Sequence, residues 1–136
     1  MASTGTAPKT ARQRPLSPHI GIYRLTLTMA MSGAHRITGV GLYAGVLLLA
    51  WFLLATSTDA ANFAVFSGFI HSIIGRIVLF GFTWALFHHM LGGVRHFIWD
   101  LGYGMDDPLR EQLAQATLVG GIVLTLVVWV IGYAVR

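Results

Sequence analysis

Two histidines, His89 and His96, stand seven residues apart where a long apolar stretch meets a cluster of charged residues. Residues i and i+7 share one face of a helix, and Gly92 and Gly93 lie on that face at i+3 and i+4. Ionisable groups inside a membrane span usually face a cavity, a partner or a cofactor. A flat macrocycle that lies against the glycines and is ligated by His89 is one interpretation. Equally, the glycines can admit another helix while the histidines hydrogen-bond within the bundle.

The composition indicates a membrane protein. Of the 136 residues, 55% are hydrophobic and 10% are charged, and the mean hydropathy is +0.69. A soluble domain of this size has more charge, and the length allows one domain at most. The chain has no cysteine, which excludes disulfides, iron–sulfur ligation and thiol nucleophiles. A redox metal in this chain would therefore have to be held by histidine.

Three charge-free windows are long enough to cross a bilayer, which takes about 20 apolar residues. They are the 22 residues Ile37–Thr58, the 18 residues Ile77–Val94 and the 24 residues Gln112–Val135. The middle window is short, but the segment before it, Phe63–Gly75, is largely apolar, so we expect its helix to begin earlier. The sequence therefore predicts an all-α membrane protein with three transmembrane helices.

The chain is expected to consist of a flexible basic tail with a short interfacial segment, residues 1–24, and a three-helix anchor domain, residues 25–136. Lys and Arg residues near span ends favour the inner side of a membrane. Seven of the nine lie before the first span or after the second, and two lie on the opposite side. This predicts an N-terminus inside and a C-terminus outside. The pI near 10.1 is then explained by basic residues that flank the spans, and nucleic-acid binding is not needed to account for it.

Haem iron commonly has two axial ligands. If His89 is one of them, none of the other histidines near it can be the second. His88 points about 100° away around the helix. His96 is about 10 Å along the axis, too far for the same iron but within reach of a propionate. His71 is roughly 27 Å away, at the outer surface or at a second haem. If a haem is present, its second ligand must come from another chain.

A second candidate site lies where the first span begins. Ser32 and Arg36 are spaced i,i+4 on one helix face, Gly39 follows three residues on, and His35 flanks them. An arginine there can clamp a carboxylate, and a serine hydroxyl can donate to a carbonyl oxygen. On this motif alone, the simpler interpretation is that Arg36 is an ordinary inner-side anchor.

Three motifs, taken in order, resemble the larger cytochrome b anchor subunit of succinate dehydrogenase, respiratory complex II. The resemblance covers nearly the whole chain, with matching order, spacing and helix number. Each motif is weak alone, and the three together are specific. They are RPLSPH at 14–19, SGAHRITG at 32–39 and HMLGGVRHFIWD at 89–100.

The resemblance implies a site for each of two redox groups. The axial ligand of one haem b falls on His89, and the other axial histidine belongs to the smaller anchor subunit. The quinone-binding residues fall on Ser32 and Arg36. The resemblance also implies three residues that contact the haem propionates or support the axial histidine: His35, Arg36 and His96. Gly92 and Gly93 are the expected packing surface for the haem.

The resemblance implies a membrane anchor of a succinate:quinone oxidoreductase that reduces ubiquinone. Its partners would be the smaller anchor, an iron–sulfur subunit, a flavoprotein subunit and membrane lipid. A quinol:fumarate reductase anchor, a haem-free structural anchor and a separate cytochrome with haems at His71 and His89 are the alternatives. Pro8 and Pro15 disfavour an amphipathic presequence, which favours a bacterial inner membrane over a mitochondrial one.

Overall fold

The computed structural model describes residues 24–135, in which four helices follow one another. They are α1 (Leu27–Ser57), α2 (Ala60–His71), α3 (Ile73–Asp100) and α4 (Leu109–Ala134). By length and composition, α1, α3 and α4 can cross a membrane, which confirms the three predicted spans. Apart from Arg24, the predicted tail and interfacial segment lie outside the described residues, as does the motif at 14–19.

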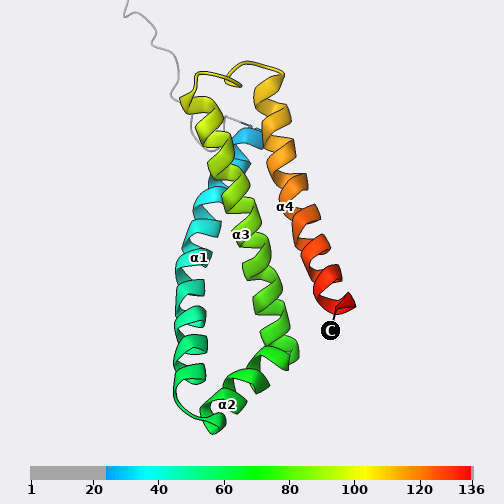
Figure 1. Ribbon diagram of the computed structural model, residues 1–136. Coiled ribbons are helices and arrows are strands. Elements are labelled where there is room, and N and C mark those ends of the chain that lie inside the picture. Colours follow the sequence, from blue (N-terminus) through cyan, green and yellow to red (C-terminus); the bar gives the residue numbers. More distant parts are fainter. Residues whose placement is uncertain (1–23, 136) are drawn as a thin grey trace, which may run out of the picture.

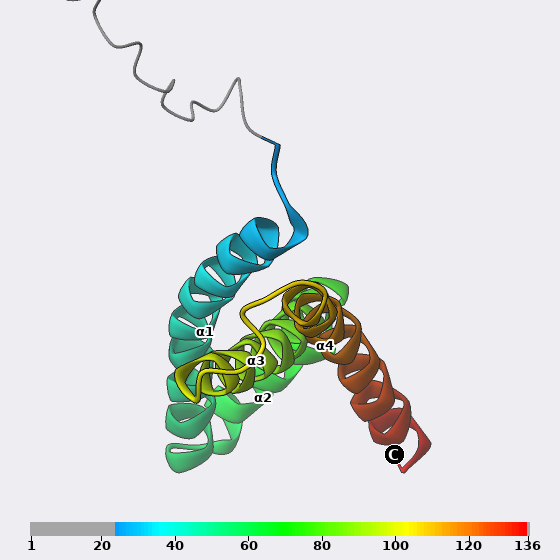
Figure 2. The ribbon, with the colours of Figure 1, turned by 90° about the horizontal axis from the view of Figure 1, so that it is seen from above.

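Helix α3 is central, with α1 on one side and α4 on the other (Figure 1). Seen from above, α1 and α4 splay away from α3 in different directions (Figure 2). We call the end of the bundle that holds residues 101–108 the loop end, and the opposite end the α2 end. Small residues permit the close contacts with α3: Gly45 of α1 lies under the ring of Phe82, and Gly121 of α4 lies against the backbone of His88.

The middle span begins at Ile73, ahead of its charge-free window, so its helix starts earlier as the sequence predicts. The rest of the apolar segment Phe63–Gly75 does not join this span. The chain forms the separate helix α2 and turns at Ser72. The Ser72 N–H donates to the carbonyl of Phe69 at 3.0 Å, and the Ser72 hydroxyl accepts from the Gly75 N–H at 3.1 Å. Ser72 thus ends one helix and caps the next. A side chain at position 75 would collide with the Phe69 backbone, so this turn requires glycine.

The turn at Ser72 also changes the position of His71. This residue is the last of α2, so it does not lie on the helix that contains His89. The axial distance derived from one continuous helix therefore does not apply. His71 is exposed at the α2 end of the bundle.

The loop between α3 and α4 turns at two glycines. Gly102 and Gly104 have φ angles of 82° and 75°, a region that glycine adopts readily. The indole N–H of Trp99 donates to the carbonyl of Gly104 at 2.9 Å and ties the loop to the end of α3. These contacts bring α4 back antiparallel to α3.

Candidate functional site

The imidazole of His89 lies between α3 and α1 towards the loop end. Its Nδ1 atom is 3.0 Å from the carbonyl oxygen of His35 and 3.4 Å from the hydroxyl oxygen of Thr38. A carbonyl oxygen can only accept a hydrogen bond, so this contact favours the tautomer with its proton on Nδ1. Nε2 then has a free lone pair. Histidines that bind a metal almost always donate the other ring N–H in this way, so His89 fits an axial haem ligand.

His35 covers one of the two glycines that were expected to pack against a macrocycle. Its ring is parallel to that of His89, with 3.9 Å between centroids and 6° between planes. It also lies directly over Gly92, where any Cβ would collide with it. By contrast, the Cβ position of Gly93 has no other atom within 4 Å. The open glycine beside His89 is therefore Gly93, and haem packing at these two positions stays a prediction.

The His96 ring completes a group of three imidazoles on the face shared by α1 and α3. Its centroid is 5.3 Å from that of His35, and it meets the Trp99 ring edge-on at 5.2 Å. His96 is exposed, whereas His35 and His89 are half-buried. We call His35, His89 and His96 the histidine cluster. The structure thus gathers three of the predicted site residues at one place.

His88 lies on the other side of α3 and is fully buried. Its ring stacks on that of Trp84, with centroids 5.1 Å apart, and its backbone lies against Gly121 of α4. Neither ring nitrogen has a hydrogen-bond partner among the described residues. The separation of His88 from His89 agrees with the helical angle, and it leaves His89 as the accessible imidazole of the pair.

Arg95 is a buried polar residue, although its sequence position places it among the basic residues that follow the second span. It is 2% exposed, and its guanidinium carbon is 5.0 Å from the centroid of the Trp99 ring. Its Nε and Nη1 atoms have no hydrogen-bond partner among residues 24–135. The available signal was its spacing from His88, because i and i+7 share a helix face. Both side chains therefore lie on the buried side of α3 and not with the histidine cluster.

Ser32 and Arg36 are both exposed on α1, one turn apart. Neither side chain has a hydrogen-bond or ion-pair partner within the described part of the chain. The adjacent residues His35 and Arg36 point in different directions, since His35 contacts α3. The predicted quinone-binding pair therefore lies on the same stretch of α1 as the histidine cluster, but on its accessible side.

Comparison with known proteins places this chain in a family. The sequence family described as succinate dehydrogenase/fumarate reductase transmembrane subunit matches residues 10–129. The chain belongs to this family. The matched range includes the histidine cluster, Ser32 and Arg36, and most of α4. The family resemblance drawn from the three motifs is thereby confirmed.

Individual relatives in this family carry cytochrome b names. The chain is 40% identical over 118 residues to the succinate dehydrogenase cytochrome b556 subunit of Paracoccus denitrificans, covering 87% of this chain and 91% of that protein. It is 35% identical over 127 residues to the b556 subunit of Rickettsia felis, covering 93% and 99%. It is 42% identical over 111 residues to the mitochondrial b560 subunit of Sus scrofa, covering 78% and 64%. Bacterial and mitochondrial proteins are thus both similar to it.

Proposed function

We propose that this chain is the cytochrome b membrane-anchor subunit of a succinate:quinone oxidoreductase. The observation that carries the proposal is His89, whose Nδ1 is hydrogen-bonded to a carbonyl of α1 and whose Nε2 has no hydrogen-bond partner among residues 24–135. The flavin and iron–sulfur centres of the peripheral subunits would supply electrons from succinate, and this chain would hold the ubiquinone that receives them. The chain has no cysteine and no nucleotide-binding motif, so its part is to hold the haem and the quinone.

One haem b, shared with the smaller anchor subunit, fits the residues at the α1–α3 face. His89 would hold it through Nε2, together with a histidine of the smaller anchor subunit. His35, Arg36 and His96 provide polar groups for the propionates, and Gly93 offers an open packing surface beside Gly92. When bound, the haem supplies one-electron redox chemistry.

The quinone site is assigned to Ser32 and Arg36. The Ser32 hydroxyl donates a hydrogen bond to a quinone carbonyl oxygen. Arg36 stabilises the negative charge that develops on that oxygen during reduction. Both side chains are exposed and without a partner in the described chain, so a ligand need not displace an internal contact. Protons reach this site from the aqueous side at the loop end.

The arrangement of Lys and Arg sets the orientation that we propose. The loop end lies inside, which places the iron–sulfur subunit next to Ser32 and Arg36, with the flavoprotein subunit bound beyond it. The C-terminus lies outside. We assign the chain to a bacterial inner membrane, with the mitochondrial inner membrane as the alternative.

Purification of the complex from its native membrane tests the proposed function. We expect mass spectrometry to identify a flavoprotein, an iron–sulfur subunit and a second small anchor, with one b-type haem per complex by absorption and iron content. Succinate should reduce ubiquinone faster than a menaquinol analogue reduces fumarate. A complex without haem would support a structural anchor, and a complex with two haems would support a separate cytochrome. Faster fumarate reduction would support a fumarate reductase.

Substitution of Gly39 by Ala is expected to disturb the haem without disturbing the helix bundle. A Cβ at position 39 would lie 3.1 Å from Cε1 of His89, close enough to push the ring away from the His35 carbonyl. Loss of such an outer contact typically lowers metal affinity by about 10–100-fold. The measurement is haem retained per complex during dilution, together with the electron paramagnetic resonance spectrum of the oxidised haem.

Gly41→Ala is the matched control, because its Cβ would lie 4.0 Å from the Ala85 side chain, an ordinary contact. It should leave both readouts unchanged. Equal behaviour of the two variants would mean that the His89–His35 contact does not position the haem ligand.

A further inference from the structure

A pocket of about 320 Å³ opens at the α2 end of the bundle, formed by α2, α3 and α4. This volume is far above the roughly 10–15 Å³ that holds one water. Leu79 and Val128 contribute to an apolar lining. The position of Arg76 is roughly 20 Å along α3 from His89 at 1.5 Å per residue, so the pocket is separate from the proposed haem and quinone sites.

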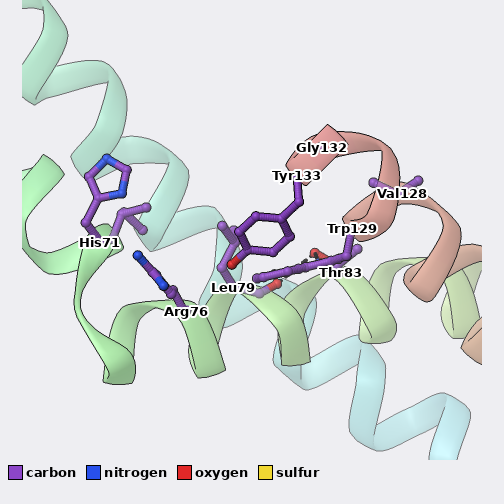
Figure 3. A pocket seen from close by; sticks show the side chains of 9 residues that line it. His71, Arg76, Leu79, Thr83, Val128, Trp129, Gly132 and Tyr133 are labelled. Atoms are coloured by element: carbon purple, nitrogen blue, oxygen red, sulfur yellow. Dashed lines mark hydrogen bonds between the residues drawn. The ribbon is translucent and has the colours of Figure 1, made fainter. Parts of the chain in front are cut away.

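One side of the pocket holds the positive charge of Arg76, with the imidazole of His71 beside it. Arg76 lies in the first turn of α3 and His71 ends α2, and both are exposed. Figure 3 shows these two side chains on the side formed by α2 and α3, with Trp129 and Tyr133 of α4 opposite them. Arg76 forms no side-chain hydrogen bond or ion pair with other described residues, and no Asp or Glu lines the pocket. An anion is therefore the complementary ligand.

Asp59 is the described acidic side chain at this end, and it is occupied elsewhere. Its two carboxylate oxygens accept hydrogen bonds from the backbone and side-chain N–H groups of Asn62, at 2.8 and 3.1 Å. It does not line the pocket. The positive charge of Arg76 is therefore not neutralised by this carboxylate.

The aromatic side chains indicate the depth of the pocket in a membrane. Trp129 and Tyr133 lie near the end of a span, where such side chains favour the level of the lipid headgroups. The Trp129 indole N–H donates to the hydroxyl of Thr83 at 3.3 Å, which fixes one wall. The mouth with Arg76 then lies at the level of the phosphates, and the apolar lining continues towards the acyl chains.

We propose that this pocket binds a membrane phospholipid, with its phosphate at Arg76 and His71 and one acyl chain along Leu79 and Val128. An anionic group joined to an apolar chain matches the order of polar and apolar lining. A neutral quinone ring brings no charge for Arg76. A transmembrane helix of another subunit packs best against small residues, whereas the mouth presents a cation and two large aromatic rings.

Native mass spectrometry of the intact complex, extracted in mild detergent, tests the site. We expect one retained phospholipid per copy of this chain in the wild type. Arg76→Gln should lower the affinity of the site for that phospholipid about tenfold, which corresponds to the loss of ~1.4 kcal/mol from one charge-assisted contact, so that less phospholipid is retained. Gly132→Phe should also lower phospholipid binding, because Gly132 lines the pocket and a ring there fills it. Folding should be unaffected, because the Cβ position of Gly132 has no other atom within 4 Å.

Two matched variants control for charge and for bulk. Arg110→Gln removes an arginine at the loop end that is paired with Asp107, and Gly68→Phe adds a ring at an open glycine that does not line the pocket. Both should retain the phospholipid. The proposal is overturned if the wild type retains none, if Arg76→Gln retains as much, or if the species lost is a quinone or another subunit. The haem band of the same samples reports on the proposed function independently.

Discussion

His89→Ala is expected to abolish the b-type haem spectrum, whereas His88→Leu should leave it nearly intact. His89 presents on the α1–α3 face an Nε2 atom that has no hydrogen-bond partner among the described residues, and its Nδ1 is hydrogen-bonded to the His35 carbonyl. His88 is fully buried between Trp84 and α4, with no room for a macrocycle. The measurement is the reduced-minus-oxidised absorption spectrum of the purified complex, with haem per complex falling by on the order of tenfold or more in the His89 variant.

The choice of Leu at position 88 separates ligation from packing. Leucine conserves volume, so it avoids the cavity cost of about 2–5 kcal/mol that truncation of a large buried side chain to Ala entails. It also removes two ring nitrogens that have no partner among the described residues. A complex that assembles with normal haem in the His88→Leu variant shows that His88 is not the ligand.

Rescue by free imidazole tests ligation more directly than loss does. In a His89→Gly variant, added imidazole has space to take the place of the missing side chain, and the haem band should return. Restoration in a His88→Gly variant and not in the His89 variant would reverse the assignment. Failure of both variants to assemble would instead make the histidine pair a packing element, as the haem-free alternative requires.

The sequence predicted the spans and the placement of His88 and His89 on different helix faces because both are properties of a single helix. A charge-free window of sufficient length predicts a span whatever packs against it. The angle of about 100° between successive residues places His88 and His89 on different faces of α3. These properties are local to one helix, so they need no knowledge of its neighbours.

The contacts between helices were not predictable in the same way. The turn at Ser72 depends on a serine hydroxyl and on Gly75 meeting the Phe69 carbonyl, and hydropathy registers neither. The placement of His35 over Gly92 depends on the register of α1 against α3. A glycine in a sequence reports that something approaches closely, without saying whether it is a cofactor or an imidazole of the same chain.

The last expected result separates quinone chemistry from the rest of the complex. Arg36→Leu and Ser32→Ala should each lower succinate:quinone activity by on the order of 10²-fold, the usual effect of losing one donor to a developing oxyanion. Arg36 should be the larger loss, because it provides a full charge. Activity with a soluble acceptor that takes electrons from the peripheral subunits should stay near normal. Both activities are measured in the same membranes, with haem content as a check on assembly.

Arg24→Leu is the matched control, since Arg24 is an exposed arginine that precedes α1 and does not share the helix face of Ser32 and Arg36. It should retain quinone reduction, because a general loss of inner-side charge acts on orientation and assembly and not on one developing oxyanion. Wild-type quinone reduction in both site variants would place the quinone elsewhere. A parallel fall of both activities would mean that Arg36 holds the peripheral subunits in place. Only a selective loss of quinone reduction, with haem retained, assigns Ser32 and Arg36 to the quinone itself.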